Sequence, residues 1–161
     1  MISDAAPADA AHVAAIYNHY IEHTVITFEV DTLGPDDMRA RIAKVVGAGY
    51  PWLVWREEGE VRGYAYASQF RDRTAYQYSA EATVYLAPDV TRKGVGTALY
   101  RELITRLRAQ GIHLVVGGIA LPNDASVGLH ESLGFRHVGT FSEIGHKFDR
   151  WIDVGFWELR L

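Results

Sequence analysis

The chain reads Thr91-Arg92-Lys93-Gly94-Val95-Gly96-Thr97 between a strand-like stretch, residues 77–86, and an amphipathic helical stretch, residues 94–110. A strand, a basic turn and the start of a helix direct unpaired backbone N–H groups and the positive end of the helix dipole at an anion. The two glycines let phosphate oxygens come close to the backbone. We predict an anion site here. This segment alone leaves open that its two glycines serve packing instead.

Two common phosphate-binding motifs do not fit the segment. The dinucleotide signature Gly-x-Gly-x-x-Gly would need a third glycine at Leu99, and no Gly-Lys-Ser/Thr follows four variable residues as a Walker A loop requires. The sequence therefore predicts neither of these two nucleotide sites.

Residues on both sides of this segment alternate between helical and strand-like patterns. Asp9 is placed to cap a first helix, and Gly34-Pro35 opens a second helix that ends at Gly47. The other expected elements are a hairpin of residues 52–55 and 61–67, strand 77–86, helix 94–110, strand 113–119, a helix from Asn123 to Leu133, and two strands within 136–161. Short turns join several adjacent strands, so we predict an α/β (α+β) fold with a mixed sheet.

Composition limits the class of protein. The 161 residues are 48% apolar and 22% charged, as expected of one globular domain with its own core. A net charge of −4 argues against binding nucleic acid, which normally requires a basic surface. The sequence has no cysteine, no signal-peptide pattern and no apolar stretch of membrane-spanning length. We expect a cytoplasmic protein without a nucleic-acid or membrane partner.

The order of elements resembles that of the GNAT acetyltransferase superfamily: strand, basic turn, Gly-x-Gly, helix, strand, Asn123, and a helix closing on Leu133-Gly134-Phe135. Five blocks resemble, more narrowly, the phosphinothricin and methionine sulfoximine acetyltransferases: Tyr17–Glu22, Tyr50–Val54, Glu81–Tyr85, Leu121–Asp124 and Asp153–Trp157. The resemblance covers essentially the whole chain. It implies a GNAT fold in one N-acetyltransferase domain, residues 1–161, with a mixed, mostly antiparallel central sheet flanked by helices.

The resemblance also implies acetyl-CoA as co-substrate, no metal, and a homodimer. Trp151 and Trp157 in the aromatic tail are candidates for the dimer interface or, equally, for the core. The residues that the resemblance assigns to acetyl-CoA are Val84, Tyr85, Leu86, Arg92, Lys93, Gly94, Val95, Gly96, Thr97, Asn123 and Ser132. Thr91 departs from the family pattern, which usually has Gln or Arg there, and this puts one phosphate contact in doubt.

Acetyl transfer to an amine needs a base, because free amines are mostly protonated at neutral pH. Glu81 shares one face of its strand with Thr83 and Tyr85, beside the expected cofactor, and burial would raise its pKa toward a useful range. A solvent-facing glutamate at a strand edge is the alternative, and the resemblance favours the base. Transfer then proceeds by direct attack in a ternary complex, since no cysteine is present to form an acetyl-enzyme.

His130 stands where many GNAT relatives have a tyrosine that protonates the leaving thiolate. Histidine can act as acid or base near neutral pH, and the phosphinothricin enzymes also have it here. Packing of the histidine without a chemical role is the alternative, because a thiolate with a pKa of roughly 8.5 can leave without an acid.

The same subfamily implies substrate-binding roles for Phe28, Arg71, Arg73, Tyr76, Thr83 and Lys147. Arg71 and Arg73 suit a substrate that carries both a carboxylate and a second oxyanion, such as phosphinothricin or methionine sulfoximine. A solvated charged loop, with Asp72 as neutralising partner, is the alternative. The expected acceptor is the α-amine of such a small amino-acid-like compound.

Two rival functions are weighed against the acetyltransferase. His19-Tyr20-Ile21-Glu22-His23 spells His-x-x-Glu-His, the inverted zinc-protease pattern, but no third ligand is evident in the sequence. A non-catalytic sensor of acyl-CoA is the other rival. The presence of Glu81, His130 and the arginine pair argues against a sensor.

Overall fold

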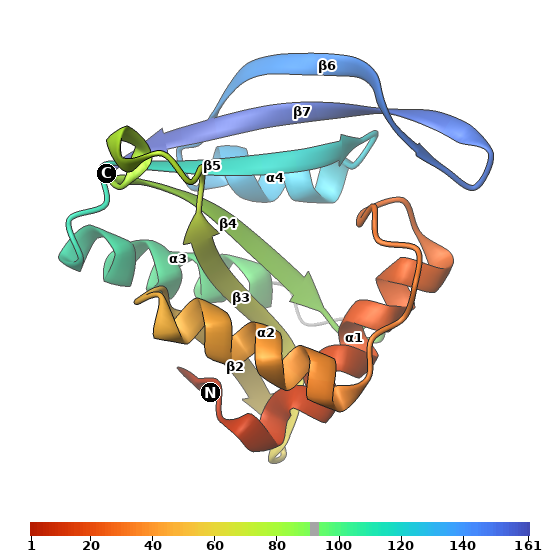
Figure 1. The fold of residues 1–161 in the computed structure, drawn as a ribbon, viewed down its shortest axis with the longest axis vertical. Coiled ribbons are helices and arrows are strands. Elements are labelled where there is room, and N and C mark those ends of the chain that lie inside the picture. Colours follow the sequence, from red (N-terminus) through yellow and green to blue (C-terminus); the bar gives the residue numbers. More distant parts are fainter. Residues whose placement is uncertain (91–93) are drawn as a thin grey trace.

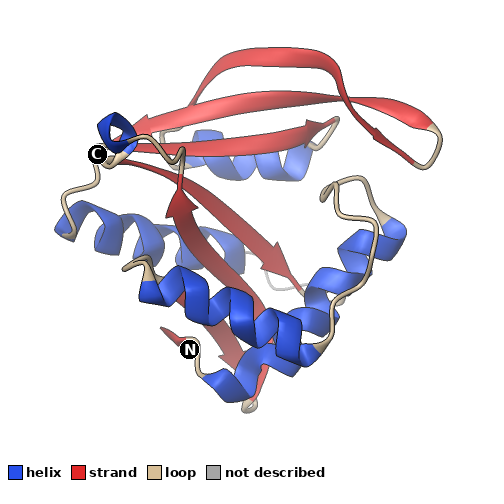
Figure 2. Cartoon of the chain, in the orientation of Figure 1, coloured by secondary structure: helices blue, strands red, loops and turns tan. Residues whose placement is uncertain are grey.

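A computed structural model describes residues 1–90 and 94–161 of the chain (Figures 1 and 2). The elements in chain order are β1 (Ile2–Asp4), the 3₁₀ turn η1 (Pro7–Asp9), α1 (Ala10–His23), α2 (Pro35–Gly47), β2 (Trp52–Glu57), β3 (Glu60–Gln69), the 3₁₀ turn η2 (Thr74–Tyr76), β4 (Ser79–Leu86), α3 (Val95–Ala109), β5 (Leu114–Leu121), α4 (Asp124–Ser132), β6 (Arg136–Lys147) and β7 (Arg150–Arg160). Every helix and strand predicted from the sequence lies within a few residues of its expected place.

The strands of the described residues form one seven-stranded sheet in the order β1-β2-β3-β4-β5-β7-β6. Strands β4 and β5 run parallel, and the other neighbouring pairs among the described strands run antiparallel. The predicted mixed, mostly antiparallel sheet flanked by helices is confirmed.

Helices cover the two faces of this sheet and bury a separate core on each. On one face α1 and α2 pack Val13, Met38 and Ile42 against Trp52 and Tyr64. On the other face the helix α3 buries a stripe of residues against the strands: Val95, Leu99, Tyr100, Leu103, Ile104 and Leu107. These six helical positions, at spacings of three and four, thus decide which side of α3 meets the sheet.

One predicted helix cap takes a different role in the structure. Asp9 precedes α1, but its carboxylate makes no capping bond to that helix. Instead Oδ2 accepts from the backbone N–H of Ala6 and from the guanidinium of Arg56, both at 2.7 Å. Burial raises the pKa of Asp9, and these two partners outweigh burial and lower it overall. Hydrogen bonds from a guanidinium and an N–H stabilise a buried carboxylate more than a bond to an exposed helix start does.

The carboxyl-terminal hairpin β6–β7 extends the sheet past β5 and curls toward the loop between α1 and α2 (Figure 1). Its register shifts between Phe141 and Gly145, where the Glu143 N–H donates to the Asp153 carboxylate at 2.7 Å. Trp157 is part of the core at 4% exposure, whereas Trp151 is 64% exposed. The sequence left open whether Trp151 and Trp157 belong to the core or to an interface. In the structure Trp157 lies in the core and Trp151 lies on the surface.

Within the described ranges, 1–90 and 94–161, no helix is both long enough and apolar enough to cross a membrane.

Candidate active site

Strands β4 and β5 start side by side and then separate (Figure 1). Their parallel pairing covers three residues of β4, from Ser79 opposite Leu114 to Glu81 opposite Val116. Beyond Glu81, β5 continues with β7 as its partner, while β4 continues with β3. A wedge-shaped split therefore opens in the middle of the sheet.

The pairing with β3 fixes which backbone groups of β4 face this split. Ala87 N–H bonds to Arg62 and Phe70 N–H bonds to Ser79, so the hydrogen-bonded pairs with β3 fall on the odd-numbered residues of β4. The N–H and C=O groups of Ala82, Val84 and Leu86 consequently point toward the split. Two of these carbonyls accept from tyrosines: Ala82 from Tyr100 at 3.1 Å, and Leu86 from Tyr20 at 2.7 Å.

The first turn of α3 lies at the mouth of the split. Gly94 caps the helix with φ = 94°, a conformation that other residues rarely adopt. A Cβ on Gly96 would lie 3.4 Å from Leu129 of α4 and 3.8 Å from Leu86 of β4, so this helix start sits between those two elements. The backbone N–H groups of the first helical turn have no partner within the helix. Arg92 and Lys93, two predicted phosphate contacts, and Thr91 lie outside the described residues.

A cavity of about 270 Å³ lies beside the split. Seven of the predicted site residues line it: Phe28, Glu81, Thr83, Val84, Tyr85, Asn123 and His130. Asn123 also caps α4, because its Oδ1 accepts from Ser126 N–H at 3.1 Å. Its amide nitrogen thus remains the group that is oriented for a ligand.

Glu81 is a half-buried carboxyl group on the wall of this cavity. Burial raises its pKa above the ordinary value for glutamate, and the positive charge of Arg71 acts in the opposite direction to a smaller extent. On the β5 side, a Cβ on Gly118 would lie 3.7 Å from Glu81 Oε1, so bare backbone stands next to the carboxylate. A carboxyl group with a raised pKa is a stronger proton acceptor than an ordinary glutamate, as a general base requires.

His130 is 3% exposed and both of its ring nitrogens have partners. Nδ1 lies 2.7 Å from the carbonyl oxygen of Ser126, and Nε2 lies 3.2 Å from the hydroxyl of Tyr100. Since a carbonyl only accepts, Nδ1 carries a proton. Burial lowers the pKa of His130, and the Ser126 carbonyl opposes this by favouring the charged ring. The imidazole is therefore held in one orientation with Nε2 toward Tyr100.

The other predicted substrate and cofactor residues lie outside this lining. Arg71, Arg73 and Tyr76 are exposed on the β3–β4 connection, with the Arg71 guanidinium 4.9 Å from the ring centre of Phe70. Ser132 is exposed, and its hydroxyl donates to the Leu129 carbonyl at 2.8 Å. The structure places the ammonium of Lys147 away from the cavity, against the carbonyl of Thr27 at 2.9 Å.

Several residues of the lining were not predicted from the sequence. They are Ile26, Thr27, Ala82, Tyr100, Gly118, Ile119, Ala120, Ser126, Val154 and Phe156. Tyr100 could have been found, because it continues the apolar period of α3 with a hydroxyl that needs a partner when buried. Gly118 and Phe156 carry no such signal, since their place depends on the pairing of β5 with β7.

The His-x-x-Glu-His pattern supplies two neighbouring histidines as candidate metal ligands. His19 and His23 lie one turn apart on α1, with ring centres 5.0 Å apart. Among the residues that the structure describes, no three histidine, cysteine or acidic side chains gather as a metal site.

Comparisons with known proteins agree with this geometry. The sequence profile of the acetyltransferase (GNAT) domain matches residues 2–155. The phosphinothricin N-acetyltransferase of Streptomyces viridochromogenes is 42% identical over 157 residues, which cover 98% of this chain and 85% of that protein. The L-methionine sulfoximine/L-methionine sulfone acetyltransferase of Salmonella typhimurium is 38% identical over 154 residues, or 96% of this chain and 90% of that protein.

A solved structure of similar shape contains acetyl-CoA. The phosphinothricin acetyltransferase of Sinorhizobium meliloti, in complex with acetyl-CoA, superposes with a TM-score of 0.96 at 37% identity, covering 100% of this chain and 88% of that one. Sequence, fold and the split beside Glu81 thus lead to one assignment: the chain belongs to the GNAT family of acetyltransferases.

Proposed function

We propose that this protein transfers the acetyl group of acetyl-CoA to the α-amine of a small amino-acid-like substrate, represented by phosphinothricin, methionine sulfoximine and methionine sulfone. The observation that carries the proposal is the Glu81 carboxyl group, which lines the cavity at the β4–β5 split and has a pKa raised by burial. The names of the relatives support the substrate class.

The described residues offer suitable groups for the thioester. Backbone groups of Val84 and Leu86 face the split and can pair with an amide-containing arm. The start of α3, from Gly94 to Thr97, suits the pyrophosphate, and the Asn123 amide can donate to the arm. Tyr85, which lines the cavity, joins this set. Arg92, Lys93 and Ser132 complete it on the family pattern alone.

Glu81 starts the reaction by taking one proton from the substrate ammonium, either directly or through one water molecule. The free amine nitrogen then attacks the thioester carbonyl carbon, a C–N bond forms and the C–S bond breaks. The thiolate leaves with the bonding electron pair and receives a proton from His130 or from water. Proton transfer by a positioned side chain contributes typically about 10² to 10⁴ in rate.

Arg73 is expected to hold an anionic group of the acceptor, together with Arg71. Because Arg73 is exposed on the β3–β4 connection and is not among the proposed acetyl-CoA contacts, its replacement by alanine should raise the acceptor KM by about tenfold and leave the acetyl-CoA KM unchanged. Steady-state kinetics in both substrates measures this. A fall in kcat with both KM values unchanged would place the acceptor pocket elsewhere.

A panel of amines tests the proposed function directly. CoA release should be rapid with methionine sulfoximine, methionine sulfone or phosphinothricin, and slow with simple alkylamines that lack a carboxylate. A protein that binds acetyl-CoA yet releases no CoA with any amine would be a sensor, and the proposal would fail. Stoichiometric zinc in the purified protein would instead support the protease alternative.

We further propose that residues 1–161 act as one domain, in the cytoplasm, as a homodimer. The profile match over residues 2–155 supports the single domain, and the need for acetyl-CoA supports the compartment. The dimer is supported by exposed apolar side chains on the carboxyl-terminal hairpin: Val138, Phe141, Ile144 and Trp151. Sedimentation velocity distinguishes an 18.0 kDa monomer from a dimer.

A further inference from the structure

The loop between α1 and α2, residues 24–34, forms one wall of the cavity that contains Glu81. Its residues Ile26, Thr27 and Phe28 line the cavity, and Phe28 is 42% exposed. Loops that line a site without regular secondary structure need other contacts to hold them in one conformation. The position of this wall therefore depends on what the loop is attached to.

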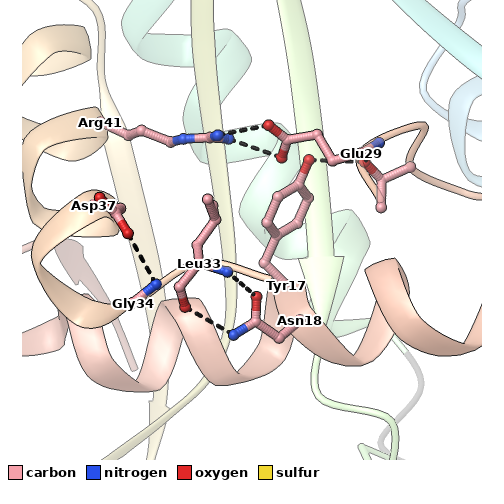
Figure 3. A network of polar contacts seen from close by, with 8 residues as sticks. Tyr17, Asn18, Glu29, Leu33, Gly34, Asp37 and Arg41 are labelled. Carbon is pink, nitrogen blue, oxygen red and sulfur yellow. Dashed lines mark hydrogen bonds and ion pairs between the residues drawn. The ribbon is translucent and has the colours of Figure 1, made fainter. Parts of the chain in front are cut away.

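The two helices that flank the loop hold it on one side (Figure 3). Polar contacts of the described residues span its length. They are Tyr17 Oη with Thr27 Oγ1 at 2.7 Å, the Asn18 side chain with the N–H and carbonyl of Leu33 at 2.9 Å each, and Arg41 with Glu29 at 2.5 and 2.9 Å. These contacts hold Thr27, Glu29 and Leu33 against the two helices, and the Phe28 side chain takes no part in them.

The hairpin β6–β7 also contacts this loop. Lys147, which is 4% exposed, donates from Nζ to the carbonyl oxygen of Thr27 at 2.9 Å. Gly145, two residues earlier on the same strand face, is covered by the ring of Phe28: a Cβ there would lie 2.3 Å from two ring carbons. Burial lowers the pKa of Lys147, so the folded protein holds this ammonium at a cost.

We propose that Lys147 and Gly145 act as positioning residues that fasten the 24–34 loop to the β6–β7 hairpin and so set the acceptor wall formed by Thr27 and Phe28. Lys147 acts through the Thr27 carbonyl, and its ammonium makes no contact with the acceptor. Gly145 provides the flat surface on which the Phe28 ring rests. The kinetic part of this inference rests on the proposed acetyl transfer.

A direct acceptor-binding role for Lys147 makes a different prediction, which allows a clear test. An ammonium that bound the acceptor side chain would matter for phosphinothricin, whose phosphinate is anionic, and little for methionine sulfone, whose sulfone is neutral. A positioning residue matters equally for both, because both contact the same wall.

Lys147→Met keeps an unbranched side chain, one atom shorter, and removes its hydrogen-bond donor and its charge. We expect the KM of phosphinothricin and that of methionine sulfone to rise by the same factor, about tenfold, with the KM of acetyl-CoA changed less than twofold. Lys44→Met, at an exposed lysine of α2, is the matched control and should leave all three values unchanged. A rise confined to phosphinothricin, or no rise with either acceptor, overturns the proposal.

Gly145→Ala tests the same attachment without removing a charge. Its new methyl group must displace the Phe28 ring, so both acceptor KM values should rise while the acetyl-CoA KM stays constant. Gly139→Ala on the same strand is the control, since nothing lies within 4 Å of the added atom. Equal kinetics of the two alanine variants would contradict the role of Gly145.

Hydrogen exchange separates this inference from the proposed reaction. In Lys147→Met, backbone amides of residues 24–30 should exchange at least several-fold faster than in the unaltered protein, and those of β4 at the same rate. This result would stand even if no amine released CoA, in which case only the proposed function would fail. Unchanged exchange in residues 24–30 would overturn the attachment itself.

Discussion

Glu81 and His130 line the same cavity, and their surroundings differ in almost every respect. Glu81 is half-buried on a strand, and the positive charge of Arg71 acts on it against the effect of burial. His130 is fully buried on a helix, bonded through Nδ1 to Ser126 and through Nε2 to Tyr100. The carboxyl pKa is raised by its environment and the imidazole pKa is lowered by its own. One group is free to exchange a proton, and the other is held in place.

Strand β5 separates these two environments with two consecutive glycines. A Cβ on Gly117 would lie 2.5 Å from His130 Nε2, and a Cβ on Gly118 would lie 3.3 Å from Phe156 and 3.7 Å from Glu81 Oε1. Because successive residues of a strand face opposite sides of a sheet, the absence of both side chains brings both groups close to β5. Glu81 and His130 therefore approach the split from opposite faces of the sheet.

Glu81→Gln should produce the largest effect, because glutamine keeps the shape of the side chain and cannot take a proton from the substrate. We expect kcat to fall by about 100-fold or more at neutral pH. The Kd of acetyl-CoA, measured by calorimetry, should stay within about twofold, since the cofactor contacts proposed above are backbone groups of β4 and α3 and do not include the Glu81 carboxylate. Unchanged turnover would remove Glu81 from the mechanism.

His130→Phe should have a smaller effect, because burial lowers the pKa of His130 and so disfavours the charged imidazole, and because a thiolate can leave without an acid. We expect a fall in kcat of about tenfold. The lost bond to the Ser126 carbonyl should also lower the free energy of unfolding by about 1–3 kcal/mol, measured in urea. If stability falls and kcat does not, His130 serves packing alone.

Gly117→Ala tests the close approach of β5 to His130 without altering the histidine. Its methyl group must displace the imidazole from Tyr100, so we expect a loss of about 1–3 kcal/mol in the free energy of unfolding and a several-fold fall in kcat. Gly128→Ala on α4 is the matched control: nothing lies within 4 Å of its added atom, and alanine favours a helix by about 1 kcal/mol over glycine. Equal stability of the two variants would contradict the proposed contact.

Local signals in the sequence were sufficient for the elements and for part of the site. The helical period and Gly94 predicted α3, and Asn123 predicted the start of α4, where it does cap the helix. The alternation in residues 77–86 placed Glu81 and Thr83 on one face, and both line the cavity. Each of these features depends on neighbours within a few residues of the chain.

The features that the sequence did not reveal all depend on distant contacts. Lys147 meets Thr27 across 120 residues, and Tyr100 meets His130 across 30. Asp9 was expected to cap α1, but Arg56, 47 residues away, takes its carboxylate. A single sequence records the residue types and not the packing of distant elements, which brings such groups together.

Replacing Arg71 is expected to have the smallest effect among these variants, and the effect is specific to the pKa of Glu81. Its positive charge lowers the pKa of Glu81 against the larger effect of burial, so Arg71→Gln should raise that pKa further. A base with a higher pKa is protonated up to a higher pH, and the acid limb of the kcat profile should therefore move to higher pH. The limb should move back in Arg71→Lys, which restores the charge. A limb that stays in place in Arg71→Gln would mean that a group other than Glu81 accepts the proton, and the contrast between a free carboxylate and a held imidazole would then no longer describe this site.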